Sequence, residues 1–150
     1  MRVFLVAPPN AVASHRWTAA PCIAALLLAS PAAAADLQIG TWFGHGQPSD
    51  KAAMYIDRMN PDGSFRVHHR ACRKGKAYDQ VQTGRWSRKG DIMTIRIETV
   101  NGVPDPRTDT YRILAESQTA QRYVYLPDNF EYNSRRVASN YEMPRCDLVS

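Results

Sequence analysis

The 150-residue chain lacks the sequence signals on which several common functions depend. It contains no G-x-S-x-G nucleophile motif, no C-x-x-C pair, and neither a G-x-G-x-x-G nor a G-K-S/T phosphate-binding pattern. After Asp36, no segment carries apolar residues at i, i+3, i+4 and i+7 for three turns, so helical periodicity is missing as well. These absences argue against the common hydrolase, zinc-binding and nucleotide-binding classes and favour an all-β chain.

A strong charge of either sign is also absent. Of the 19 Lys and Arg and the 14 Asp and Glu, only Arg2 and Arg16 precede Asp36, so the rest of the chain carries a net charge of +3. This mild basicity gives no reason to expect a nucleic-acid partner. A basic stretch over residues 66–76 places Arg66, His68 and Arg70 on one outward strand face, which is either a solvated face or a surface for an anionic partner.

No apolar run is long enough to cross a membrane as a helix. The longest, over residues 19–29, falls short of the ~20 residues that a span requires. It follows a basic start and precedes Pro31 and three alanines at 33–35, a small-residue cleavage pattern. We therefore predict a signal peptide over residues 1–35, a single domain over residues 36–150 in the periplasm or outside the cell, and no membrane span once the signal is removed.

Cysteine is scarce, and two cysteines remain in the predicted domain. An even number of cysteines in a small exported domain predicts a disulfide between Cys72 and Cys146, with two free thiols as the alternative. Cys72 shares the outward face of Arg70, so the bridge is expected to hold the C-terminal tail against the outside of that strand.

Alternating apolar and polar residues, interrupted by turn signals about every ten residues, dominate the chain after Asp36. Met54 and Ile56 alternate with Tyr55 and Asp57, for example, and Asn101-Gly102 is a strong hairpin signal. The pattern predicts roughly eight short strands in an all-β, antiparallel up-and-down barrel, with a two-sheet sandwich as the alternative. Residues 101–109 and 127–129 are expected to be the longest loops, at the barrel mouth.

The triplet Gly40-Thr41-Trp42, at the start of this all-β region, resembles the GxW signature of the calycin superfamily, which includes lipocalins and shorter bacterial relatives. The resemblance implies that Trp42 fills the closed end of the barrel. It also implies that a base of the last strand, Arg135 or Arg136, packs across the Trp42 ring. Unlike a full lipocalin, the chain shows no C-terminal helical period. A barrel this small is either filled by its own side chains or holds one small ligand.

Aromatic residues on the predicted strands either build the core or line a pocket. The candidate ligand-binding residues are Tyr55, His69, Tyr111, Tyr123 and Tyr125. We expect a non-enzymatic binding protein of the cell envelope for a small apolar ligand or lipid, with no cofactor, metal or catalytic residue. His68 and His69 are adjacent on a strand and point to opposite faces, so they cannot chelate one ion together. The alternative is an inhibitor of an envelope protease or lysozyme that acts through its surface or through residues 36–40.

Overall fold

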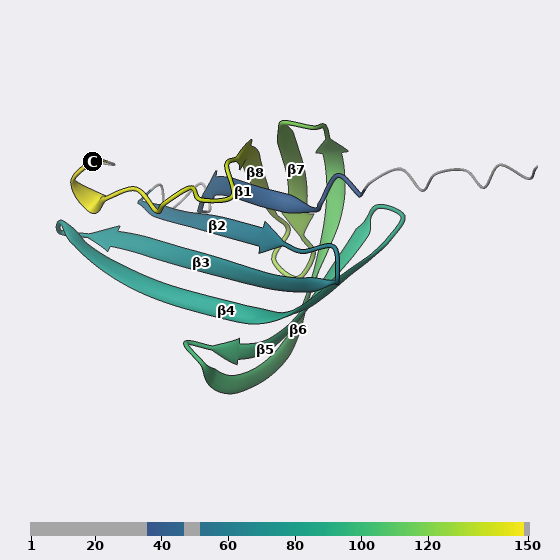
Figure 1. The fold of residues 1–150 in the computed structure, drawn as a ribbon, viewed down its shortest axis with the longest axis horizontal. Coiled ribbons are helices and arrows are strands. Elements are labelled where there is room, and N and C mark those ends of the chain that lie inside the picture. The colour runs from purple at the N-terminus through teal and green to yellow at the C-terminus, as the bar shows by residue number, and fades with distance from the viewer. Residues whose placement is uncertain (1–35, 47–51, 149–150) are drawn as a thin grey trace, which may run out of the picture. The chain divides into compact units, whose positions relative to one another are not determined.

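The computed structural model describes residues 36–46 and 52–148, which form a closed barrel of eight antiparallel strands (Figure 1). Each strand pairs with the next, and the last closes on the first. The strands are β1 (Gly40–His45), β2 (Ala53–Met59), β3 (Ser64–Arg73), β4 (Lys76–Lys89), β5 (Ile92–Val100), β6 (Val103–Glu116), β7 (Ala120–Tyr125) and β8 (Phe130–Val137). The predicted all-β barrel is confirmed and the sandwich is excluded. The expected signal peptide lies outside the described residues.

The loop predicted over residues 101–109 was wrong, because β6 already begins at Val103. Asn101 and Gly102 close a tight turn with φ values of 50° and 79°, and Pro104 then pairs with Thr99. Both prolines of this region fall within the first four residues of β6, beside a register shift in the facing strand. Prolines are tolerated at strand starts and bulges, so the sequence signal for a loop was misleading. At 14 residues each, β4 and β6 are also longer than predicted.

Alternation along the strands divides the apolar side chains between the barrel interior and a small outer cluster. The interior cluster consists of Tyr55, Met59, Phe65, Val67, Met93, Ile95, Ile97 and Tyr123. The outer cluster consists of Phe43, Met54 and Ile56, which pack with Val137, Tyr141 and Met143. The second cluster is covered by the C-terminal tail rather than by the barrel.

The end of the barrel at the start of β1 is closed around Trp42, whose side chain is fully buried. The indole Nε1 donates to the Gln38 carbonyl at 2.9 Å, and the Arg136 guanidinium lies 4.3 Å from the ring centroid. Arg136 also donates to the carbonyls of Leu37 and Ile39, at 2.9 and 2.8 Å. Residues 36–39 are thereby tied to this end of the barrel.

Gly40 is required where it stands for two reasons. Its φ of 138° disfavours L side chains, and a Cβ at this position would meet the Arg136 guanidinium. The glycine therefore makes room for the arginine that covers Trp42. Arg135 has a different place, since its guanidinium lies on the outer side, 5.1 Å from the Phe43 ring centroid.

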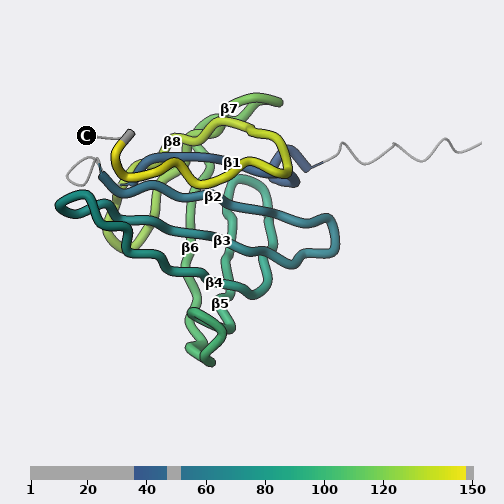
Figure 2. Tube along the Cα trace, turned by 60° about the vertical axis from the view of Figure 1, so that its left-hand side comes forward, coloured from purple at the N-terminus to yellow at the C-terminus, as the bar shows by residue number. Residues whose placement is uncertain are grey.

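The predicted disulfide between Cys72 and Cys146 is confirmed, with the two Cα atoms 5.3 Å apart. It holds the tail along the outer side of the barrel, near β1 and β2 (Figure 2). Arg58 and Arg70 donate to the tail carbonyls of Tyr141 and Pro144, at 3.0 and 3.1 Å. A disulfide of this kind fits a protein that folds in an oxidising compartment.

Candidate ligand-binding cavity

The barrel interior holds a cavity of about 540 Å³. Pockets for small molecules usually measure about 300–1,000 Å³, so one small ligand fits. Small residues stand near the end opposite Trp42, where Gly46, Ala53 and Ala71 line the cavity and leave space that larger side chains would fill. The barrel interior therefore contains space for a ligand and is not completely filled by its own side chains.

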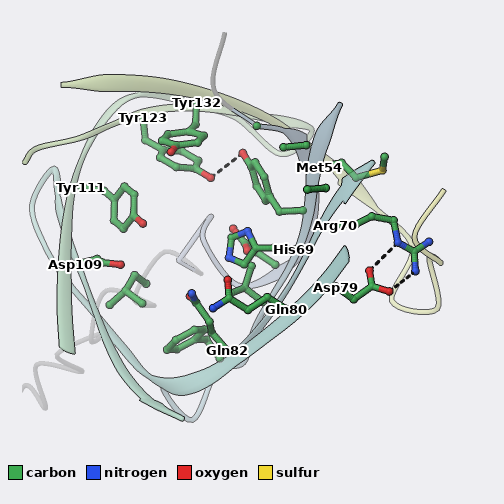
Figure 3. A pocket seen from close by; sticks show the side chains of 18 of the residues that line it. Met54, His69, Arg70, Asp79, Gln80, Gln82, Asp109, Tyr111, Tyr123 and Tyr132 are labelled. Atoms are coloured by element: carbon green, nitrogen blue, oxygen red, sulfur yellow. Dashed lines mark hydrogen bonds and ion pairs between the residues drawn. The ribbon is translucent and has the colours of Figure 1, made fainter. Parts of the chain in front are cut away.

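Tyrosines from neighbouring strands form one wall (Figure 3). Tyr123 stacks on Tyr132 with centroids 5.7 Å apart, and Tyr111 meets Tyr123 edge-on at 5.6 Å. The Tyr123 hydroxyl donates to the Tyr55 hydroxyl at 2.8 Å, which links β7 to β2 across the interior. Burial raises the pKa of Tyr55, Tyr111 and Tyr123, so these hydroxyls are neutral near pH 7.

Polar side chains from β3 and β4 face this wall. Figure 3 shows His69, Gln80 and Gln82 on the side opposite Tyr111 and Tyr123. Burial lowers the pKa of His69, so its ring is neutral near pH 7, and one ring nitrogen is hydrogen-bonded to Gln82. The two amides add further donors and acceptors that can orient a ligand.

Asp57 on β2 lines the same cavity. Among the described residues, no hydrogen bond or ion pair reaches its carboxylate, and burial raises its pKa to about 7. The carboxylate lies close enough to Tyr55 and Tyr123 to raise the pKa of both hydroxyls further. A carboxyl group in this state can accept a hydrogen bond from a ligand, pair with a cation or exchange a proton.

The ionisable side chains that line the cavity are mostly acidic. Asp57, Asp79 and Asp109 contribute carboxylates, and Arg70 is the one fixed cation among the described lining residues. Arg70 is already engaged, because its Nε and Nη2 donate to the two Asp79 oxygens at 2.7 and 2.9 Å. This pair lies at the edge of the cavity (Figure 3). The interior is therefore acidic although the predicted domain is basic overall.

Four of the five predicted ligand-binding residues line the cavity: Tyr55, His69, Tyr111 and Tyr123. Tyr125 is not among the lining residues, but its hydroxyl donates to Asp109 at 3.2 Å. Sequence reasoning missed Asp57, Tyr132 and Gln82. For Asp57 a signal existed, since alternation places it on the same strand face as Tyr55.

Comparison of the chain with models of known protein families and with curated proteins gave no match. Within residues 36–46 and 52–148, no three His, Cys, Asp or Glu side chains gather as metal ligands do. The same part of the chain contains no helix with the length and apolarity needed to span a membrane.

Proposed function

We propose that the protein is an exported binding protein that holds one small molecule inside its barrel, in the periplasm or outside the cell. The observation that carries the proposal is the 540 Å³ cavity, whose walls combine tyrosine rings with a few polar groups. Ligand sites in proteins typically have this composition, with apolar walls for affinity and sparse polar groups for orientation. The function proposed is binding without chemical conversion of the ligand.

The residues that line the cavity restrict the chemical class of ligand that we expect. His69 and Gln82 already share a hydrogen bond, but a purely apolar molecule would leave the Asp57 carboxyl without a partner, at a cost of roughly 1–3 kcal/mol for a buried polar group. A long acyl chain suits the space poorly, because polar side chains stand along one wall. A compact molecule with an apolar body and one polar end fits better than a lipid.

Membership of the calycin superfamily is part of this proposal. Gly40, Trp42 and Arg136 support it, because they meet at the closed end in the arrangement that the resemblance implies. An inhibitor that acts through residues 36–40 gains no support, since hydrogen bonds from Arg136 and Gln121 hold that segment on the barrel.

The test uses N-phenyl-1-naphthylamine, a neutral dye that fluoresces in apolar sites. We expect it to bind the native protein with one site and to bind the Val67→Phe variant more weakly. Val67 is buried and lines the cavity, and inserting a larger side chain typically costs ~1–3 kcal/mol, or about tenfold to a hundredfold in affinity. Val103→Phe is the matched control, because Val103 is 65% exposed and lies outside the cavity.

If both variants bind the dye with equal affinity, the dye does not bind in the cavity, and the proposal is contradicted. A second measurement identifies the natural ligand. Native mass spectrometry of the protein purified from its own envelope should show a bound molecule of constant mass. The fraction of the protein that carries this molecule should be lower in the Val67→Phe variant.

A further inference from the structure

The charged residues that line the cavity indicate which charge the polar group of a ligand would carry. Of the two carboxylates on strand faces that point inward, Asp109 already accepts the Tyr125 hydroxyl. Asp57 has no partner among the described residues, and Arg70 is occupied by Asp79. The cavity thus contains a carboxyl group for which these residues supply no counter-charge when it ionises.

A carboxylate removed from water without a partner is costly, so a ligand that supplies a partner for the ionised Asp57 gains affinity. A neutral ligand can give Asp57 one hydrogen bond but leaves the charge uncompensated. An anionic ligand would add like-charge repulsion. A cation supplies both the counter-charge and, if it carries N–H groups, the donors.

The tyrosine wall supports the same conclusion independently. Cations are attracted to aromatic ring faces within about 6 Å of the centroid, and the effect grows when the pair is removed from water. Tyr55, Tyr111, Tyr123 and Tyr132 meet at centroid distances of 5.6 to 6.1 Å, so several rings border one space. The neutral hydroxyls of Tyr55, Tyr111 and Tyr123 accept hydrogen bonds from an ammonium group as well as donating them.

From the unpartnered Asp57, the surrounding tyrosine rings and the absence of a free guanidinium or ammonium among the described lining residues, we infer that the cavity binds a small organic cation. The ligand carries an ammonium group beside Asp57 and an apolar or aromatic body against the interior cluster. This inference rests on the proposed function and specifies the chemical class of its ligand.

The experiment compares three probes of similar size by isothermal titration calorimetry: benzyltrimethylammonium, neutral 2-phenylethanol and anionic 3-phenylpropanoate. The native protein should prefer the cation to the alcohol by on the order of tenfold or more, as expected for a desolvated cation–π and charge interaction. It should bind the anion most weakly. In Asp57→Asn, which keeps the shape of the side chain, the preference for the cation should fall severalfold, to what the tyrosine rings alone supply, while the alcohol binds as before.

Asp109→Asn is the matched control, because it removes an acid that lines the cavity but already has a partner. It should retain most of the preference for the cation. Equal binding of cation and alcohol by the native protein, or a preference that is undiminished in Asp57→Asn, would overturn the inference and leave the cavity function standing. If Val67→Phe also leaves the binding of the neutral dye unchanged, the proposed function fails as well.

Discussion

Replacing Asp57 by Asn should change how the stability of the protein depends on pH. Burial raises the pKa of Asp57 from 3.8 to about 7, so the folded state holds a proton that the unfolded state has released between these values. Stability therefore falls as pH rises through this window and levels off above it. With 1.36 kcal/mol per pKa unit, the total cost approaches about 4 kcal/mol, of which roughly 2–3 kcal/mol accumulates between pH 5 and pH 8.

Asn carries no charge, so its own burial cost is the same at every pH. The free energy of unfolding of Asp57→Asn, relative to the native protein, should therefore increase by roughly 2–3 kcal/mol from pH 5 to pH 8. Urea unfolding at constant ionic strength, followed by tryptophan fluorescence, measures the difference at each pH.

Asp62→Asn provides the control for the pH series. Hydrogen bonds from Ser64 lower the pKa of Asp62, so this exposed carboxylate is ionised in both states throughout the range. Its substitution should shift stability by the same amount at pH 5 and pH 8. If the curves for Asp57→Asn and the native protein also run parallel, Asp57 ionises normally and the reasoning is refuted.

Three further substitutions test the packing of the barrel. Trp42→Ala should lower the free energy of unfolding by about 3–5 kcal/mol, because the ring is fully buried; a near-neutral result in urea would contradict its role at the closed end. Gly44→Ala should cost ~1–3 kcal/mol and weaken dye binding, since a Cβ there would meet the Tyr55 ring; unchanged stability and affinity would show that Tyr55 moves freely. Cys146→Ser should lower the melting temperature under oxidising conditions, by an amount corresponding to about 4 kcal/mol for the loop that the bridge to Cys72 closes. An equal loss under reducing conditions would contradict that origin.

The sequence was sufficient to predict the barrel, because alternation and turn chemistry are local signals. Asn101 and Gly102 both adopt positive φ, as their residue types indicate. The G-x-W spacing occurs a second time at Gly84-Arg85-Trp86, so only its position at the start of the all-β region singled out Gly40-Thr41-Trp42. Gly84 serves a different purpose, since it stands at a register shift where a Cβ would meet the backbone of Arg96.

The candidate site was only partly predictable, for a physical reason. Aromatic residues on strand faces were a useful but incomplete guide: four of the five predicted positions line the cavity, whereas Phe43 packs in the outer cluster and Tyr78 is 58% exposed. Asp57 was overlooked because a charged residue in a strand is usually exposed. The alternation of side chains along β2 places Asp57 on the inward face with Tyr55, whereas its charge predicts an exposed position. Such conflicts between two local rules are expected at functional sites, where stability is given up for binding.

The cost of Asp57 and the gain from the disulfide are of similar size and lie in separate parts of the molecule. Asp57 faces Val67 across the β2–β3 ladder, and Cys72 stands five residues further along β3, or roughly 16 Å at the usual rise. Changes this far apart are usually additive. Asp57→Asn should therefore restore at pH 8 much of the stability that Cys146→Ser removes, and restore less at pH 5. If Asp57→Asn stabilises the native protein at pH 8 but does not stabilise the Cys146→Ser variant, the disulfide and the cavity are energetically coupled, and the expected additivity is wrong.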